Sequence, residues 1–519
     1  MNKHLLSVAF ICALALPSFI SSCTSSAHSE NNRLVILHTN DTHSQIEPGR
    51  DGLGGVMRRK AIIDSIRKAE KNVLLVDAGD AVQGTLYFYL YGGKVEQEIL
   101  NILGTDIRIL GNHEFDNGID SLAAVLANSD ATKIATNYNL DNTPLAGQFQ
   151  PFEIKEIGSK KIGFIGINLN PDGIVAQGNY NGLEFLPIIA TANVAAEKLK
   201  KEENVDAVIA LTHIGYNPAG LVGDSILAAN SRNIDVIIGG HSHDTIDPET
   251  AEGNRRSHMK NLDGKPMLVV QTGKAGRNIG KIEINLDSLG LGAVPGYEII
   301  PVTSRYDGYN DPTLAAVIAR YSAGVDSLMT DWIGTTDHLL KTSEPELLNF
   351  FADYVYGRGK ELSSGVDLSI VNKGGLRADI PAGRFSKGHI INMVPFRNYV
   401  TVVELKGKDL ADVFDVMATT KGNGVSGNVK VTFTDKDGEP EVKSVLIDGK
   451  PLIPEKTYRV ATIDYLANGG DYMTGFTRGQ KVAQSPNAVF DDLLHYFIDG
   501  KGKDKVLSSS MDNRWTLEN

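Results

Sequence analysis

The chain has 519 residues, which fits two or three domains, and its 42% hydrophobic and 22% charged residues are typical of a folded globular protein rather than a disordered one. The formal charge of −12 argues against a protein that coats nucleic acid, because such proteins carry a basic surface. The only two cysteines are Cys12 and Cys23, so the chain beyond them has no disulfide, thiolate metal site or cysteine nucleophile.

The first 22 residues are predicted to be a secretory signal. Lys3 supplies the positive charge, and the apolar run Leu5–Leu16 that follows is too short to span a bilayer. Ile20-Ser21-Ser22-Cys23 resembles a lipobox, at which the signal is cut and Cys23 is acylated. The alternative is an ordinary signal peptide cut at a nearby small residue. Residues 23–32 are expected to be a flexible tether, and the protein is expected in the periplasm or on the cell surface, anchored by lipid to a bacterial membrane.

Short apolar strands alternate with helical segments from Arg33 onward, which predicts an α/β sheet with helices on its faces. The predicted strands are Leu34–Thr39, Val73–Asp77, Ile107–Leu110, Ile162–Ile167, Val205–Leu211 and Ile234–Ile238. The predicted helices include Met57–Lys71, Val95–Leu103 and Ile189–Glu203. In such sheets, ligand sites form where strands end and loops begin.

A different pattern follows Tyr306. Asp311-Pro312 is a good helix start, and Thr313–Trp332 is predicted to be an amphipathic helix that connects two domains. Later strand-like segments are Val400–Leu405, Val429–Thr434, Val442–Ile447 and Arg459–Ile463, with a hairpin turn expected in Lys421–Asn428. We therefore expect a catalytic domain at 33–306, a linker at 307–334 and a second domain at 335–519.

Five of the predicted strands end in Asp, Asn or His. These blocks are Asn40-Asp41-Thr42-His43, Asp77-Ala78-Gly79-Asp80, Gly111-Asn112-His113-Glu114-Phe115-Asp116, Thr212-His213 and Gly239-Gly240-His241-Ser242-His243. Each block alone fits a capped turn or an interior histidine. Their joint occurrence at strand ends favours a metal site, and carboxylate, imidazole and carboxamide ligands together suit Zn²⁺, Mn²⁺ or Fe²⁺.

The order D-x-H, G-D, G-N-H-E, H and G-H-x-H resembles the metallophosphoesterase superfamily, and the strings I-L-H-T-N-D-T-H, G-N-H-E-F-D and G-G-H-S-H resemble the 5′-nucleotidase family. The resemblance implies an N-terminal αββα sandwich, a connector helix and a C-terminal α+β substrate-binding domain. It also implies two divalent metal ions. Asp41, His43, Asp80 and His243 would hold one ion, and Asp80, Asn112, His213 and His241 the other, with Asp80 as the bridge.

The resemblance also assigns catalytic residues. His113 would stabilise the transition state or protonate the leaving group, and Asp116 would orient its ring. The alternative for Asp116 is an N-cap of the predicted helix Ile119–Ala127. His38 matches the family's strand but is not a ligand there, so it is expected to be structural or to support a ligand.

Three segments of the second domain look like the family's nucleotide-binding elements. By resemblance the substrate-binding residues are Arg377 for the phosphate, Phe396 and Tyr465 for stacking on the base, Asn372 for the base edge and Asp471 for the ribose. The alternative for the two aromatic residues is a place in the core. The chain departs from the family pattern at Lys373, which interrupts a glycine run, at Arg397, and at Lys341, where family members often have an arginine.

The expected function is metal-dependent hydrolysis of nucleoside 5′-monophosphates such as AMP, with no polymeric nucleic acid as partner. The alternatives are a UDP-sugar hydrolase, a 2′,3′-cyclic nucleotide phosphodiesterase, a non-enzymatic surface binding protein, or a thiol hydrolase of sulfur oxidation from the same superfamily. The resemblance also implies that the second domain swings on the connector helix. The sequence leaves the preferred nucleotide, the metal and the oligomeric state open.

Overall fold

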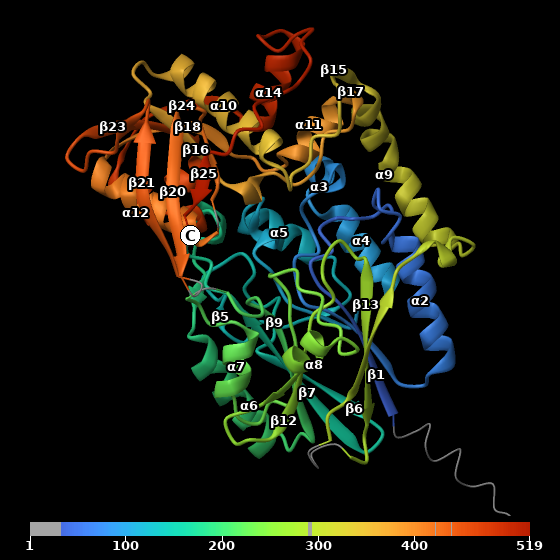
Figure 1. Cartoon of the computed structure of the whole chain (residues 1–519). Coiled ribbons are helices and arrows are strands. Elements are labelled where there is room, and N and C mark those ends of the chain that lie inside the picture. The colour runs from blue at the N-terminus through green and yellow to red at the C-terminus, as the bar shows by residue number, and fades with distance from the viewer. Residues whose placement is uncertain (1–32, 219, 289–292, 421, 437–438, 519) are drawn as a thin grey trace, which may run out of the picture.

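The computed structural model describes residues 33–518 except 219, 289–292, 421 and 437–438. The predicted signal and tether, with Cys12 and Cys23, lie outside this part of the chain. Two domains are stacked, and the long helix α9 runs along one side of the molecule (Figure 1). None of the helices in the described residues combines the length and the apolar character that a membrane span needs.

The N-terminal domain contains two six-stranded sheets. The first has the order β14-β13-β1-β2-β3-β4, with bounds Gly296–Pro301, Asn278–Asn285, Arg33–Thr39, Val73–Asp77, Ile107–Arg108 and Thr132–Lys133. The second has the order β11-β12-β10-β9-β7-β6, with bounds His258–Lys260, Pro266–Val270, Val236–Ile238, Ala207–His213, Lys160–Asn168 and Phe152–Ile157. A short pair, β5 (Tyr138–Asn139) and β8 (Glu184–Phe185), lies apart from both sheets.

The alternation of apolar side chains on β1 explains why the sheets pack face to face. Leu34 and Ile36 point into a core that the second sheet completes with residues such as Phe164. Val35 and Leu37 point the other way and pack under helices. Successive strand residues face opposite sides, so one apolar run covers both faces of a buried sheet. The αββα sandwich expected from the sequence is confirmed.

Helices cover the outer faces of both sheets. Those over the first sheet are α2 (Val56–Ala69), α3 (Leu86–Tyr91) and α4 (Lys94–Leu103), whereas α6 (Ile188–Lys201) and α7 (Asp224–Asn230) pack on the second. The short helices α5 (Ile119–Leu126) and α8 (Ala251–Ser257) complete the domain. Strands β1 to β4 run parallel, as do β7, β9, β10 and β12, so their carboxyl ends gather at one edge of each sheet.

Helix α9 (Pro312–Thr330) is the predicted connector. The Asp311 carboxylate accepts a hydrogen bond from the Leu314 amide at 2.8 Å, and Pro312 occupies the first turn, as expected for a helix start. The helix ends two residues earlier than predicted because Trp332 already belongs to β15 (Trp332–Thr336). Helix α9 contacts α3 and α4 of the N-terminal domain and α11 of the C-terminal domain.

The C-terminal domain is built on a five-stranded sheet and a four-stranded sheet. The first has the order β19-β16-β23-β18-β24, with bounds Gly424–Val425, Leu368–Val371, Thr457–Ile463, Tyr399–Lys406 and Gln480–Ala488. The second has the order β22-β21-β20-β25, with bounds Lys450–Pro451, Glu439–Ile447, Val429–Lys436 and Trp515–Leu517. Its helices are α10 (Pro345–Leu362), α11 (Lys387–Met393), α12 (Gly407–Thr419), α13 (Asp464–Ala467) and α14 (Val489–Ile498), and β17 (Gly383–Ser386) pairs with β15.

The hairpin expected in Lys421–Asn428 is wrong. Gly424 and Val425 form β19, which pairs with β16 and not with the next strand, β20. Strand β20 pairs with β21, the strand that follows it in the chain. The Gly-Asn-Gly pattern indicates a turn, but it does not determine which strand the chain pairs with after it.

Candidate active site

Loops from both sheets of the N-terminal domain meet at the edge where the parallel strands end. Three groups of side chains there have donor atoms that lie within 4.8 Å of one another in each group. The groups are Asp41, His43 and His243; His43, Asp80 and His113; and Asp80, His213 and His241. All the Asp and His residues predicted as metal ligands from the sequence therefore lie in one cluster.

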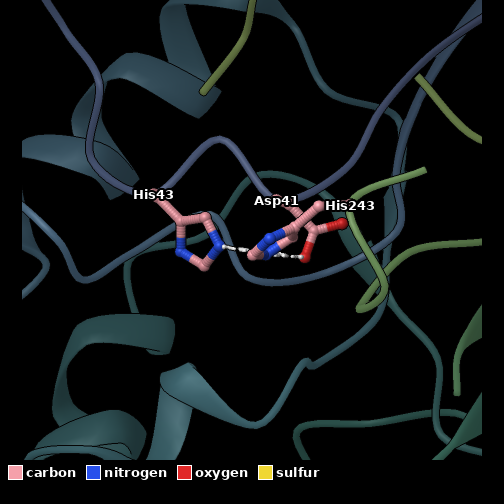
Figure 2. Close-up of side chains that lie close together, drawn as sticks. All are labelled: Asp41, His43 and His243. Carbon is pink, nitrogen blue, oxygen red and sulfur yellow. Dashed lines mark hydrogen bonds and ion pairs between the residues drawn. The ribbon is translucent and has the colours of Figure 1, made fainter. Parts of the chain in front are cut away.

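The first group joins the loop after β1 to the loop after β10 (Figure 2). His43 Nε2 and His243 Nε2 are 3.0 Å apart. Asp41 Oδ1 lies 3.5 Å from the His243 nitrogen and 3.9 Å from the His43 nitrogen. Three donor atoms from segments far apart in the sequence therefore converge on one point.

The third group, Asp80, His213 and His241, is centred on Asp80. His213 Nδ1 lies 2.7 Å from the Ala78 carbonyl oxygen, so this nitrogen donates and Nε2 faces Asp80 Oδ2 at 3.1 Å. His241 Nδ1 lies 2.9 Å from the Asn112 amide oxygen, which brings Asn112 to the same group. A hydrogen bond to a carbonyl is the usual way to orient a ligating imidazole.

The charges in the cluster are strongly interdependent. Burial raises the pKa of Asp41 to about 7, while the histidines beside Asp80 hold the pKa of that carboxyl well below its usual range against the effect of burial. Burial alone would lower the pKa of His213, but Asp80 and Asp41 raise it to about 10. Burial lowers the pKa of His241 and of His243 to about 3. The two carboxylates thus stabilise positive charge between them, and the outer imidazoles stay neutral and able to ligate.

The cluster fits divalent metal ions on its own chemistry. The buried His43 Nδ1 has no hydrogen-bond partner among the described residues, and His213 Nε2 faces the carboxylates of Asp80 and Asp41. Carboxylate oxygens, neutral imidazole nitrogens and one amide oxygen form a mixed ligand set that suits Zn²⁺, Mn²⁺ or Fe²⁺. The metallophosphoesterase fold with this His and Asp cluster implies divalent metals.

The ligand loops have an unusual backbone. The residues with left-handed φ are Asp41 (51°), His43 (47°), Asp80 (54°), His241 (77°) and His243 (59°). This region is uncommon for residues other than glycine and costs of order 1–3 kcal/mol at each position. Strain of this kind concentrates at functional sites, where surrounding contacts hold it in place.

His113 stands beside the cluster with its own carboxylate. Its Nδ1 lies 2.9 Å from Asp116 Oδ2, and its Nε2 lies 4.0 Å from Asp80 Oδ2. Burial alone would lower the pKa of His113, but Asp116 and Asp80 raise it above its ordinary value. The alternative for Asp116 is wrong, because the N-cap of α5 is Gly118. Asp116 is instead turned toward the His113 ring.

One large cavity, with a volume of about 1310 Å³, extends from the cluster into the C-terminal domain. Its lining includes all five predicted substrate-binding residues, Asn372, Arg377, Phe396, Tyr465 and Asp471. The Phe396 ring lies 5.8 Å from the His113 ring, and the Arg377 guanidinium lies 5.8 Å from the Phe396 ring. The two domains therefore meet at the cavity.

Hydrogen bonds fix the far side of the cavity. Asn372 Nδ2 donates to Asp471 Oδ2 at 2.7 Å, and the Tyr465 hydroxyl donates to Asp471 Oδ1 at 2.8 Å. A Cβ atom at Gly470 would lie 2.6 Å from the Tyr465 ring, so only a glycine allows the backbone to cover this face of the ring. Phe396 and Tyr465 both line the cavity, so neither is simply a core residue.

Two residues discussed from the sequence, Lys341 and His38, lie outside the cluster. Lys341 donates to Glu344 at 2.8 Å on the surface and is not among the residues that line the cavity in the described chain, so it does not replace an arginine there. His38 is fully buried and stacks on Tyr297, and burial lowers its pKa to about 3. Neither ring nitrogen of His38 has a hydrogen-bond partner among the described residues, so His38 is structural and supports no ligand.

The sequence reasoning missed two residues next to the cluster. Asp224 is fully buried, and it accepts hydrogen bonds from Thr212 Oγ1 at 2.6 Å and from Gln271 Nε2 at 2.8 Å. Lys274 lies near Arg377 and Asp41, and burial together with the cations Arg377 and Arg277 lowers its pKa. Neither residue belongs to a motif. The only signal in the sequence is that Asp224 begins a half-buried helix, where an acidic residue on the buried face is unusual.

The sequence matches two families of known proteins. Residues 34–245 match the calcineurin-like phosphoesterase family, and residues 329–478 match the 5′-nucleotidase C-terminal domain. The chain is 30% identical to the snake venom 5′-nucleotidase of Naja atra over 84% of this chain and 90% of that protein. It is 26% identical to the trifunctional nucleotide phosphoesterase protein YfkN of Bacillus subtilis over 93% of this chain, but it spans only 36% of that longer protein.

Among solved structures, the chain resembles the 5′-nucleotidase precursor from Thermus thermophilus. The TM-score is 0.82 at 28% identity, and the alignment covers 94% of this chain and 99% of that chain. The likeness therefore extends over both domains and the helix between them.

Proposed function

The chain belongs to the 5′-nucleotidase family, whose members are phosphoester hydrolases, and we propose that it hydrolyses nucleoside 5′-monophosphates to nucleoside and phosphate with two divalent cations. The observation that carries the proposal is one cavity that is lined both by residues of the Asp and His cluster and by Phe396 and Tyr465. A substrate with a phosphate for the cluster and a base for the aromatic side chains fits this lining. Family membership favours an enzyme over a surface binding protein, and the aromatic pair favours a nucleobase over a sulfur-oxidation substrate.

We assign one cation to each of two sets of residues in the cluster that share Asp80. Asp41, His43, Asp80 and His243 hold one cation, and Asp80, Asn112, His213 and His241 hold the other, with Asp80 shared. Two cations bound there would offset the negative charge of the phosphoryl group and polarise its oxygens. Arg377 adds a positive charge from the C-terminal domain. Burial lowers the pKa of Arg377, and the carboxylates of Asp80, Asp116 and Asp41 oppose that shift from across the cavity.

His113 is the proposed proton donor. Asp116 accepts a hydrogen bond from His113 Nδ1–H, which orients the ring so that Nε2 points toward the cluster. As the oxygen of a water molecule forms its bond to phosphorus, the bond from phosphorus to the 5′-oxygen breaks, and His113 Nε2 gives its proton to that oxygen. One proton of the water stays on the released phosphate, and the other passes to solvent, from which His113 is protonated again. Burial opposes the protonated ring, but Asp116 and Asp80 outweigh it and raise the pKa of His113, which favours the protonated form that this role requires.

A panel of nucleotides tests the proposal. Phosphate release would be measured from nucleoside 5′-monophosphates, a 3′-monophosphate and di- and triphosphates, each with Mn²⁺, Zn²⁺ or a chelator. We expect release from the 5′-monophosphates with metal and none with chelator. Absence of metal-dependent release from every nucleotide would overturn the proposal.

The size of the cavity favours UDP-sugar hydrolysis as a second candidate. Its volume of about 1310 Å³ exceeds the roughly 300–1,000 Å³ of common ligand pockets. The cavity continues past the cluster along α4 and α5 to Lys94, Asn101 and Asn128, and reaches Arg397 on the other side. A sugar or a second phosphate would occupy this extension. The same panel with a UDP-sugar and a 2′,3′-cyclic nucleotide ranks these activities against the first.

We also propose that the protein is exported and held on a membrane by lipid on Cys23, and that its domains divide at 33–306, 307–334 and 335–519. The support for the anchor is the Ile20-Ser21-Ser22-Cys23 pattern alone. Growth with a labelled fatty acid should label the wild-type protein, and the Cys23→Ala variant should carry no label. A Cys23→Ala variant that remains labelled would overturn the lipid assignment.

A further inference from the structure

Glu114 belongs to the G-N-H-E-F-D string, but the proposed reaction assigns it no task. Its side chain is only 1% exposed, and it lies directly behind the cluster. We propose that Glu114 is a positioning residue, whose carboxylate joins the loop that carries Asp80 to the turn that carries Asn112 and His113. This inference rests on the proposed function of the cluster as a metal site.

Three backbone amides donate to the Glu114 carboxylate. Oε2 accepts from the Asp80 amide at 3.0 Å and from the Gly111 amide at 2.6 Å. Oε1 accepts from the Ala81 amide at 2.9 Å. One side chain therefore binds the backbone of both segments, and it contacts the residue that we assign as the bridging ligand.

The two segments are packed so closely that their relative position leaves little room for adjustment. A Cβ atom at Gly111 would lie 2.1 Å from Asp80 Oδ1, so only glycine fits there. The same Asp80 oxygen accepts from the His113 amide at 2.9 Å. Loss of the Glu114 contacts would therefore move Asp80, Asn112 and His113 relative to one another.

Both carboxylate oxygens are needed. Glutamine has nearly the same shape, but it offers one acceptor oxygen and places an NH₂ group where the other oxygen accepted. In either orientation of a glutamine amide, at least one backbone amide of Asp80, Ala81 or Gly111 would face a donor. A buried amide left without an acceptor is costly, so the segments are expected to separate.

A competing role for Glu114 is to neutralise Arg108. Arg108 Nη2 lies 3.4 Å from Glu114 Oε1, and its Nη1 donates to Gln97 Oε1 at 2.9 Å. Both side chains of the ion pair are at most 3% exposed. Removal of one partner of a buried ion pair is strongly destabilising, so a loss of activity in a single variant would not separate the two roles.

A cycle of three variants separates them. The variants are Glu114→Gln, Arg108→Gln and the double variant, in which both charges of this ion pair are removed. For each, the affinity for Mn²⁺ or Zn²⁺ alone would be measured by calorimetric titration, the melting temperature with a chelator present, and kcat and KM with saturating metal.

If Glu114 positions the loops, Glu114→Gln lowers the metal affinity about 10- to 100-fold and lowers kcat at saturating metal by a similar factor, with KM within about twofold of wild type. The double variant regains part of the melting temperature lost in Glu114→Gln, because neither member of the ion pair is left alone, but it keeps the low metal affinity. Arg108→Gln shows the opposite pattern, a lower melting temperature with metal affinity retained.

Wild-type metal affinity in Glu114→Gln, or in the double variant, would overturn the inference. If the single variant fails to fold, the double variant alone decides between the roles. A wild-type protein that binds metal but hydrolyses no nucleotide would overturn the proposed function and leave the positioning role standing. A wild-type protein that binds neither Mn²⁺ nor Zn²⁺ would overturn both.

Discussion

At the scale of single residues, ionisable side chains that lie a few ångströms apart in the site have pKa values shifted in opposite directions. Asp80 remains ionised while Asp41 holds a raised pKa, and His213 is protonated where His241 and His243 are neutral. His213 Nε2 lies 3.1 Å from Asp80 Oδ2 and 3.9 Å from Asp41 Oδ1, so a proton on this nitrogen lies where a cation held by Asp80 and His213 would bind. Proton and metal therefore compete for the same carboxylates.

The roles of His113 and Asp80 can be separated by a pair of variants. His113→Ala should lower kcat by about 10²–10⁴-fold with both metals still bound, because in the proposed mechanism His113 moves a proton and holds no cation. Asp80→Asn, the matched variant, should lose metal from both positions, because its carboxylate is the proposed bridge. Elemental analysis of each purified variant checks the assignment, and full metal content in Asp80→Asn would contradict the bridge.

Asp224 gives a prediction about pH. Burial raises its pKa from 3.8 to about 7 in spite of the hydrogen bonds from Thr212 and Gln271. The folded state therefore binds this proton more tightly than the unfolded state. The resulting stability is complete below pH 3.8 and is lost as the pH rises through about 7.

The Asp224→Asn variant cannot titrate at this position. Relative to wild type, its melting temperature should therefore rise between about pH 4 and pH 8, measured with a chelator so that metal does not contribute. A difference between the two proteins that does not change with pH would show that the Asp224 carboxyl keeps an ordinary pKa.

At the scale of elements, the sequence predicts the strands well where apolar runs are long. Val73–Asp77 is predicted with the bounds that the structure has, and Ile162–Ile167 lies inside the longer β7. Strand β13, which lies between β14 and β1, is not predicted from the sequence, although Ile279, Ile282 and Ile284 are buried in it, because glycine and charged residues interrupt the apolar run. Its antiparallel pairing with β1 depends on contacts between distant parts of the chain, which a local pattern does not contain.

The same limit applies to the site. The ligand motifs lie at strand ends, so their meeting at one edge was predictable from the topology of parallel strands. Asp224 and Gln271 lie on separate elements and are joined only by the fold, so no spacing in the sequence marks them. The backbone of Gly239 packs against the Asp224 side chain, since a Cβ atom at Gly239 would lie 2.0 Å from Asp224 Oδ2.

The start of α9 offers a test at this scale. Asp311→Ala should lower the free energy of unfolding by about 1 kcal/mol, because the Leu314 amide loses its acceptor. Asp311→Asn keeps an acceptor oxygen and is the matched control. Denaturant unfolding of the three proteins, with kcat measured alongside, would detect the change; equal losses in both variants would point to the ion pair with Lys60 instead.

At the scale of the whole molecule, the chemistry and the selection of substrate are divided between domains. The cluster belongs to the N-terminal domain, whereas Asn372, Tyr465 and Asp471 belong to the C-terminal domain. Helix α9 contacts both. A rotation of the C-terminal domain about this helix would carry a bound nucleoside toward or away from the cluster without a change inside either domain.

The division of roles predicts the effect of a variant in the base site. Tyr465→Ala should raise KM for a nucleoside 5′-monophosphate about 5- to 100-fold through lost stacking, and should leave hydrolysis of 4-nitrophenyl phosphate nearly unchanged. Tyr465→Phe keeps the ring and loses only the hydrogen bond to Asp471, so it is the matched control. Equal losses with both substrates would mean that Tyr465 acts on the chemistry rather than on the base.

The left-handed backbone at Asp41, His43, Asp80, His241 and His243 affects how sensitive the protein is to proteolysis once metal is lost. When cations are bound, they hold these residues in place. After chelation the same backbone strain favours local opening, so the loops should become cleavable by proteases while both sheets remain folded. Limited digestion with and without chelator, read by mass spectrometry, should place the first new cuts in these loops. A protein that has lost its metal would then be inactivated by protease cleavage in these loops before it unfolds globally.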